Sequence, residues 1–232
     1  MKNLKYSVLL ILFFWLGSQA PVLAQIDSRG RVTSTIIADG LAQLPAKNVS
    51  TYNQVMEELA QTGSVGMKSL IGMMNPSAQG GNASFEYAID GVVNYVTRPD
   101  KVNLKNKVKD GLVLGLQDCK DEVQQAFLLT LLQKLATASD VSVFESYLQK
   151  DYLRPYVLQA LAVIPGIDDY LVEKIPSSPL SKSSLAHLIS MRQLTHSSLE
   201  PLLLSWIPGA DDSTLTEIYH ALAVCGTSKS LN

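Results

Sequence analysis

Apolar residues recur along this chain at intervals of three and four positions, and no other sequence feature constrains the fold as strongly. On an α-helix, residues at this spacing lie on one face, whereas a half-buried strand would alternate at every second residue. Few windows of the sequence alternate in that way. The spacing therefore predicts an all-α protein. The clearest stripes are Phe85, Ala88, Ile89, Val92, Val93 and Val96, and then Leu128, Leu131, Leu132 and Leu135.

The predicted helices are short, and the Pro, Gly, Ser and Asp residues between them group the helices in twos. The first helices of successive pairs should begin near residues 82, 121, 154, 184 and 213. Steps of about 30 to 40 residues are typical of helical-repeat proteins, in which each pair covers the apolar stripe of its neighbour. We expect residues 25–232 to form an α-solenoid of antiparallel, HEAT-like helix pairs. A compact helical bundle is the alternative.

The N-terminal segment has the pattern of a secretory signal peptide. Lys2 and Lys5 precede an apolar run, and small residues end at Ala24. The run is too short to cross a hydrocarbon core of about 30 Å. We expect residues 1–24 to be cleaved and the remainder to be exported, to the periplasm or the extracellular space, without stable membrane insertion.

Composition excludes several classes of function. The chain has 19 basic and 21 acidic residues and a net charge of -2, so it lacks the positive surplus of a nucleic-acid-binding protein. Two cysteines and three histidines are too few for a dedicated metal cluster. We find no catalytic constellation, and we expect neither a metal nor a cofactor. In a solenoid, Cys119 and Cys225 would lie too far apart to form a disulfide.

Two sets of side chains are candidates for an interaction surface. Lys101, Lys105 and Lys109 are four residues apart, so they share one helix face and form either an anion-binding patch or an ordinary solvated face. Tyr87 and Tyr95 lie on one side of a helix, where they either stack on a saccharide or pack between repeats. The sequence leaves both alternatives open.

Acidic residues and asparagines near predicted helix starts suggest capping. Asp121 and Asn82 each precede an apolar stripe, and Asn48 begins a similar segment. The adjacent acids Glu57-Glu58 and Asp211-Asp212 are also interpreted as caps or as turn residues.

The last predicted helix carries an apolar stripe with no second helix of its pair after it. Its members are Leu215, Ile218, Tyr219 and Leu222. Four large side chains left half exposed would forfeit several kcal/mol, at about 1.5–3 kcal/mol each. We therefore expect the array to be incomplete at its C-terminal end. Another protein domain, a downstream domain or a second copy of the chain would cover this helix.

The segment FEYAIDGVVNYVTRPDK, residues 85–101, and the helix pair within residues 50–75 resemble a known family. They are similar to the N-terminal helical-repeat region of secreted Bacteroidetes proteins that carry a downstream 3-keto-disaccharide hydrolase domain. The likeness covers roughly residues 25–160. The family's β-sandwich domain has no counterpart here, so the resemblance brings no catalytic residue to this chain.

Two functions fit these observations. The first is an exported helical-repeat scaffold or protein-interaction module without catalytic activity of its own. The alternative is an N-terminal accessory module of a saccharide-degrading enzyme whose catalytic domain lies outside this chain, with a saccharide as a further ligand.

Overall fold

The computed structural model describes residues 30–231, and these fold entirely into helices, short 3-10 turns and loops, with no β-strand. The predicted signal peptide lies outside the described residues. The α-helices are α2 (Thr33–Ala42), α3 (Val49–Gln61), α4 (Gly63–Gly72), α5 (Ala83–Val96), α6 (Val102–Asp118), α7 (Glu122–Leu132), α8 (Val141–Glu145), α9 (Arg154–Val163), α10 (Asp168–Lys174), α11 (Lys182–Arg192), α12 (Leu199–Trp206) and α13 (Asp212–Cys225). The 3-10 turns are η1 (Ser77–Gln79), η2 (Pro99–Lys101), η3 (Ala138–Asp140), η4 (Ile175–Ser177) and η5 (Ser228–Leu231).

The all-α prediction is confirmed, and the helices begin close to the predicted positions. The odd-numbered helices α5, α7, α9, α11 and α13 begin at residues 83, 122, 154, 182 and 212. Side chains at their starts explain part of this agreement. Asp121 accepts hydrogen bonds from the backbone N–H groups of Val123 and Gln124, and Asp211 accepts one from Thr214. Each bond satisfies a donor that has no partner within its helix.

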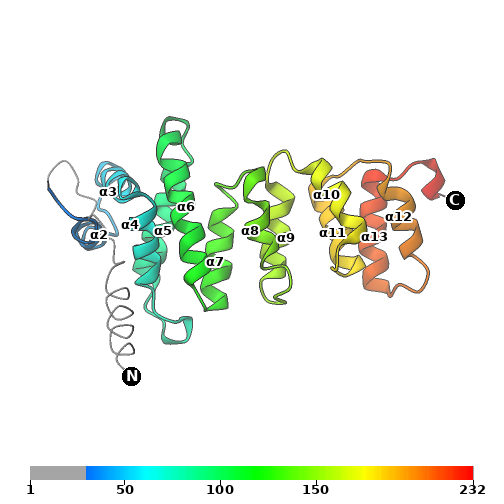
Figure 1. Ribbon diagram of the computed structural model, residues 1–232, viewed down its shortest axis with the longest axis horizontal. Coiled ribbons are helices and arrows are strands. Elements are labelled where there is room, and N and C mark those ends of the chain that lie inside the picture. The colour runs from blue at the N-terminus through cyan, green and yellow to red at the C-terminus, as the bar shows by residue number, and fades with distance from the viewer. Residues whose placement is uncertain (1–29, 232) are drawn as a thin grey trace, which may run out of the picture.

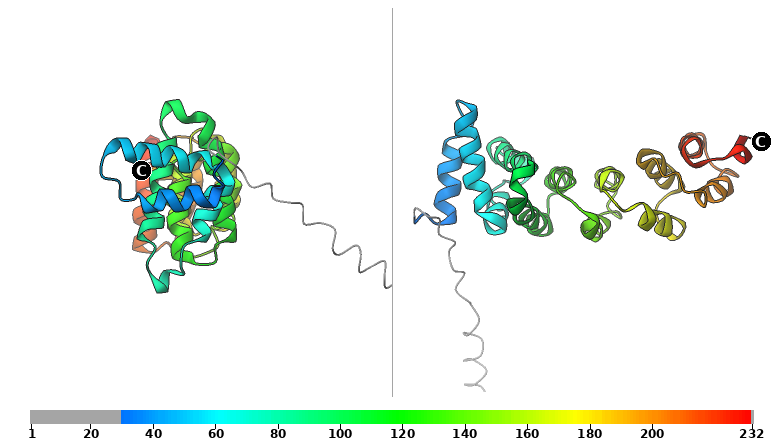
Figure 2. Two further views of the ribbon diagram at one scale, coloured as in Figure 1. Left: turned by 90° about the vertical axis from the view of Figure 1, so that its left-hand side faces the viewer. Right: turned by 90° about the horizontal axis from the view of Figure 1, so that it is seen from above.

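The described helices follow one another along an elongated molecule, with α2 at one end and α12 and α13 at the other (Figure 1). Seen from above, they form two rows (Figure 2, right). The odd-numbered helices from α5 to α13 make up one row, and the even-numbered helices from α6 to α12 make up the other. Each described helix contacts mainly its near neighbours in the chain, for example α3 with α5, α4 with α6, and α11 with α9 and α13.

The core is one continuous apolar cluster that extends from Ile37 in α2 to Cys225 in α13. The stripes predicted from the sequence supply it: Ile89, Val92 and Leu128 are fully buried. Each helix therefore buries the face that its apolar spacing defines, and the adjacent helices exclude water from it.

Helices α4 and α6 approach closely because α6 carries glycine where the two helices meet. A Cβ atom on Gly111 would lie 2.8 Å from the carbonyl oxygen of Ser64, and one on Gly115 would lie 2.5 Å from Ile71 Cδ1. The absence of a side chain at these positions allows the backbone of α6 to lie against α4. This contact fixes the geometry of the N-terminal half of the molecule.

Within residues 30–231, no helix combines the length and the apolar character that crossing a bilayer requires. Cys119 lies at the C-terminal end of α6, and Cys225 is the last residue of α13. The two thiols are free in the structure.

Candidate interaction surface

The outward side of the odd-numbered helices, which we call the odd-helix face, carries a varied set of exposed side chains. On each helix it consists of residues at helical spacing that are exposed or half-buried. They are Tyr87, Asp90 and Asn94 on α5, Val123, Phe127 and Lys134 on or after α7, Pro155, Gln159 and Val163 on α9, and His187 and Met191 on α11. The face therefore combines aromatic, aliphatic and polar side chains along the length of the row.

A hydrogen-bonded group joins α5 to the end of α7 on this face. The Lys134 ammonium donates to Asp90 Oδ1 at 3.0 Å and to Asn94 Oδ1 at 3.0 Å. The Asn94 amide in turn donates to Asp90 Oδ2 at 2.8 Å. Each side chain holds the next in one orientation, so a partner would meet a surface that is already ordered.

Two tyrosines and an arginine continue this group toward α3. The rings of Tyr52 and Tyr87 lie edge to face, with centroids 6.2 Å apart and an interplanar angle of 69°. The Arg98 guanidinium donates to Asn53 Oδ1 at 2.9 Å and lies 4.7 Å from the centre of the Tyr95 ring. Burial, followed by the nearby Tyr87 and Asp90, raises the pKa of Tyr52, so its hydroxyl stays protonated.

We call these seven residues the polar-aromatic patch: Tyr52, Asn53, Tyr87, Asp90, Asn94, Arg98 and Lys134. Its large aromatic side chain Tyr87 has 45% of its surface exposed. Tyrosine and arginine are the residue types that most often dominate the energetics of protein interfaces. The patch has the composition and the fixed geometry of such an interface.

A buried contact below the patch holds α3 and α5 together. The Tyr95 hydroxyl donates to Glu57, and the Lys101 ammonium lies 2.8 Å from Glu57 Oε2. Burial alone would raise the pKa of Glu57, but the hydrogen bonds from Lys101, Tyr95 and Gln61 outweigh it and hold that pKa below its ordinary value. Burial and the adjacent carboxylate raise the pKa of Tyr95. Glu57 is therefore an anion that connects two helices, and not the cap expected from the sequence.

A groove of about 550 Å³ lies at the other end of the odd-helix face, between α9, α11 and the start of α13. Its apolar residues are Pro155, Leu158 and Met191. Two pairs of charged side chains lie among its lining residues: Arg154 donates to Asp151 Oδ1 at 2.6 Å, and His187 Nδ1 lies 3.0 Å from Glu217 Oε2. Seven of the ten lining residues are polar or charged, so the groove is a mainly polar surface with a few apolar side chains.

A second hollow, of about 620 Å³, lies between α4, α6 and the start of α7. Cys119 is among its lining residues, and its thiol is bonded to the Gln124 side chain at 3.3 Å. Burial raises the pKa of this thiol above its ordinary value, so the reactive thiolate is disfavoured. Asp121 is occupied by its own contacts, because it caps α7 and accepts from the N–H and hydroxyl of Ser77. This hollow holds no activated nucleophile.

The residues that the sequence proposed as an interaction surface differ in how exposed they are in the structure. Tyr87 is exposed, while Lys101 and Lys105 are half-buried. The prediction is wrong for Tyr95, which is 6% exposed, and for Lys109, which is 8% exposed. Tyr95 lies below the polar-aromatic patch and packs between helices. Packing is the second of the two alternatives that the sequence left open for this residue.

Lys109 is buried because a carboxylate from another element reaches it. Its ammonium donates to both oxygens of Asp140, at 2.9 and 2.7 Å. Burial would raise the pKa of Asp140, but the bonds from Lys109 and Thr137 outweigh it and lower that pKa. Lys101, Lys105 and Lys109 therefore do not form a single cationic patch, since Lys101 and Lys109 each bind a carboxylate.

The apolar stripe of α13 is also divided. Ile218 and Leu222 are buried in the core, since α13 packs on both α11 and α12. The expectation that all four residues lack cover is wrong for these two. Leu215 is half-buried and Tyr219 is exposed.

No group of three or more histidine, cysteine, aspartate or glutamate side chains within residues 30–231 is arranged to hold a metal ion. What the described odd-helix face offers is hydrogen bonding, ion pairing and aromatic contact. Sequence reasoning missed Asn53, Asp90, Asn94 and Lys134. The spacing of Tyr87, Asp90 and Asn94 on one side of α5 was a usable signal for two of them.

Comparisons of this chain with protein-family models, with curated proteins and with solved structures found no match.

Proposed function

We propose that this chain is an exported α-solenoid of HEAT-like helix pairs that acts as a scaffold, and that its odd-helix face binds another protein. One observation carries the proposal: the polar-aromatic patch exposes Tyr87 among side chains that hydrogen bonds already hold in place. Groups that are ordered before binding lose little conformational freedom when a partner arrives.

The two ends of the odd-helix face suit a partner that follows the row. The patch lies on α3, α5 and α7, and the groove lies on α9, α11 and α13. Val123 and Phe127 on α7 lie between them and add apolar surface. A polypeptide that contacts all three regions would bury aromatic and aliphatic side chains centrally and polar side chains at the edges, as specific interfaces do.

Site-specific photocrosslinking in the cell envelope of the source organism tests this function. A photoreactive amino acid would replace Tyr87 or Gln159 on the odd-helix face, and Val65 of α4 or Leu114 of α6 as matched controls. All four positions are exposed. We expect one discrete protein adduct from the first two positions only. Adducts of equal yield from all four, or none from Tyr87 and Gln159, would contradict the proposal.

The resemblance of residues 85–101 to the repeat region of the hydrolase-linked proteins stays a prediction. The accessory role in saccharide degradation stays a prediction with it. The same crosslinking experiment bears on that role, because an accessory module would yield an adduct with a carbohydrate-active enzyme.

A further inference from the structure

Arg192, the last residue of α11, binds the C-terminal end of α9. Its guanidinium Nη1 donates to the carbonyl oxygens of Leu161 at 3.3 Å and Ala162 at 3.1 Å, and also to that of Ile164. Its Nε donates to Asp168 Oδ1 at 2.8 Å. The side chain is 8% exposed. One buried side chain therefore joins the end of α11 to the end of α9 and to the start of α10.

This contact supplies donors that the end of α9 lacks. The last carbonyl groups of a helix have no partner within the helix, and together they form its negative end. A guanidinium carries several N–H donors in one plane, so it can bind more than one of these oxygens at once. Hydrogen bonds from a charged donor are also stronger than those between neutral groups. The C-terminal ends of α9 and α11 are therefore held at a fixed separation.

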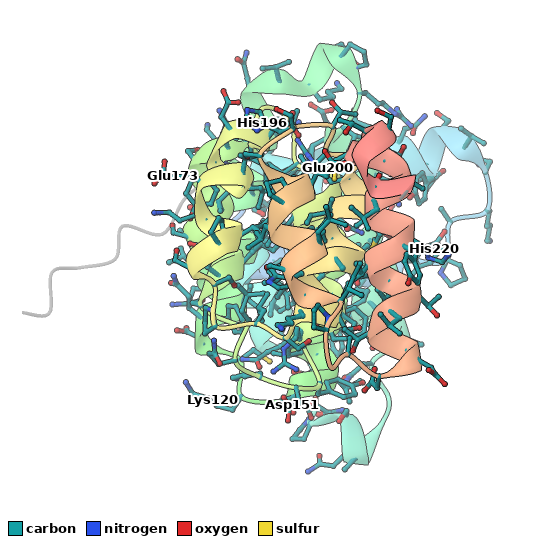
Figure 3. All side chains as sticks on the ribbon, turned by 90° about the vertical axis from the view of Figure 1, so that its right-hand side faces the viewer. Lys120, Asp151, Glu173, His196, Glu200 and His220 are labelled. Atoms are coloured by element: carbon teal, nitrogen blue, oxygen red, sulfur yellow. The ribbon has the colours of Figure 1, made fainter. Side chains whose placement is uncertain are left out.

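The N-terminal part of α9 is not held against α11 in this way. The groove of about 550 Å³ lies between the two helices, and its lining on α11 extends from Ser183 to Met191. Figure 3 shows Asp151, which precedes α9, at one edge of the molecule and His196, which follows α11, at the opposite edge. The lining residues on α9 all come from the first part of that helix: Arg154, Pro155, Leu158 and Gln159. The groove therefore follows the part of α9 that lies away from the Arg192 contact.

Polar contacts do not bridge this groove within the described part of the chain. Arg154 binds Asp151 on the α9 side, and His187 binds Glu217 of α13. Within residues 30–231, the hydrogen bonds between α9 and α11 all come from Arg192. The two helices otherwise pack through buried apolar side chains. Apolar contacts have no preferred direction, so they resist separation of the helices but allow a small rotation.

The next boundary along the row is different. Helix α11 packs more extensively on α13 than on α9, and α13 buries Ile218, Ala221 and Leu222. His187 Nδ1 and Glu217 Oε2, 3.0 Å apart, also connect α11 with α13. Helix α12 packs on α13 in turn. Helices α11, α12 and α13 therefore form one unit.

Helix α10 connects this unit to the preceding helices on the same side as Arg192. Asp168, which Arg192 binds, is the first residue of α10. Two residues later, the Tyr170 hydroxyl donates to Glu145 Oε1 of α8 at 2.6 Å. Both contacts lie at the start of α10, close in the chain to the end of α9. They leave the N-terminal part of α9 unconnected to α11.

We propose that α9 and α11 meet at a joint. Arg192 holds their C-terminal ends together, and the unit of α11, α12 and α13 turns about this point, which widens or narrows the groove. Rotation of a rigid unit about a few fixed residues is a common form of domain movement. The proposal concerns the free chain, so it holds whether or not the odd-helix face binds a protein.

Double electron–electron resonance between spin-labelled cysteines tests the joint. Labels on Pro155→Cys and Asp212→Cys report on the starts of α9 and α13, and labels on Val163→Cys and Ala223→Cys report on the ends of the same helices. All four positions are exposed. We expect the distance distribution at the starts to be about twofold broader than that at the ends. Equal widths would overturn the proposal.

The labels are placed in a chain that carries Cys119→Ser and Cys225→Ala, so they attach only at the chosen positions. In this chain, Arg192→Gln should broaden the distribution at the helix ends by about twofold, because the fixed point is lost. Arg192→Lys should broaden it as well, since one ammonium group does not reproduce the planar guanidinium. Ser183→Trp places a large side chain in the groove, so it should lengthen the distance at the starts and leave that at the ends unchanged.

Circular dichroism of each variant shows whether it is folded. An unchanged distribution at the helix ends in a folded Arg192→Gln or Arg192→Lys variant would overturn the proposal, as would equal lengthening at both ends in Ser183→Trp. If Arg192→Gln unfolds the chain, the comparison of the two label pairs in the chain that keeps Arg192 still decides the question. Photocrosslinking from Tyr87 and Gln159 measures binding and not geometry, so the two results are independent.

Discussion

The two halves of the row pack by different means. All glycines within the described helices lie in α2 to α6, and none lies in α7 to α13. In the N-terminal half, Gly91 faces Met56 and Gly111 faces the backbone of α4, so helices approach until backbone and side chains touch. In the C-terminal half, the buried positions between odd helices carry larger side chains such as Leu161 and Ile189.

The ion pairs of the molecule also differ in how far they are buried. The buried pair of Lys109 and Asp140 joins α6 to η3, where the two halves meet, whereas pairs within the C-terminal half, such as His187 with Glu217, are largely solvated. The C-terminal half uses Arg192 instead, which donates to the carbonyl oxygens of Leu161, Ala162 and Ile164 at the end of α9. Adjacent helices therefore pack with their backbones close together in the N-terminal half, and through larger side chains in the C-terminal half.

The largest effect is expected from Asp140→Ala, which leaves the Lys109 ammonium buried without its carboxylate. Loss of one partner of a buried pair costs about 3–5 kcal/mol. Chemical denaturation measures the change in the free energy of unfolding. Asp151→Ala in the C-terminal half is the control, because Asp151 is exposed and its pair with Arg154 should contribute less than about 1 kcal/mol. Equal losses in the two variants would contradict the contrast between the buried pair at the junction of the halves and the solvated pairs of the C-terminal half.

Adding one methyl group at Gly111 should also destabilise the protein. The new Cβ of Gly111→Ala would lie 2.8 Å from the Ser64 carbonyl oxygen and 3.0 Å from Ser64 Cα, so α4 and α6 must separate. We expect a loss of about 1–3 kcal/mol, measured by thermal melting. Gly72→Ala is the matched control, because no atom lies within 4 Å of its Cβ position. The higher helix propensity of alanine should leave that variant unchanged or more stable by up to about 1 kcal/mol.

Acid should weaken the region from α3 to η3 first, because the pKa values of Glu57, Asp121 and Asp140 are all lowered there. In α12 and α13, the pKa of the cap Asp211 is also lowered, but Asp211 is exposed and its bonds contribute less. The pKa values of Asp140 and Glu57 are lowered in the folded chain, so both carboxylates contribute stability above their unfolded pKa values, near 4. That stability is lost as the pH falls through the lower folded values. Once residues 1–24 are removed, the tryptophan that remains is Trp206 in α12. Below about pH 4, helical circular dichroism should decrease before Trp206 emission changes. Simultaneous changes would contradict the prediction.

The smallest effect is expected from His187→Ala. The pair of His187 and Glu217 is solvent-exposed on one side, and such pairs contribute less than about 1 kcal/mol. The melting temperature should change by less than about 4 °C. A larger decrease would show that the contact between α11 and α13 depends on this pair and not on its apolar side chains.

The sequence predicted the helices because apolar spacing is a local property. It also predicted the caps formed by Asp121 and by Asn48, whose side chain accepts from Thr51 N–H. Asn82 was predicted to cap α5, and this was wrong. Its amide accepts from the Asn75 N–H and donates to the Asn75 carbonyl, each at 2.8 Å, and so closes the loop before α5.

The surface was harder to predict because it depends on partners that are distant in sequence. Lys109 is 31 residues from Asp140, and Glu57 is 38 residues from Tyr95. A single apolar stripe describes a helix with one buried side, but α6 is covered by α4, α5 and α7 together. Lys109 is therefore buried although it lies outside the stripe of Leu104, Val108, Leu112 and Leu116 that the sequence defines.

The neighbour-to-neighbour contacts of the helices have a consequence for how the molecule opens. Because α13 packs on α11 and α12, whereas α6 packs on α3, α4, α5 and α7, the C-terminal helix can detach while the region around α6 keeps its core. Amide protons should then exchange faster in α13 than in α6. A protein that binds across several odd-numbered helices would suppress this local opening along the row. Amide exchange would then slow even at residues that the bound protein does not contact.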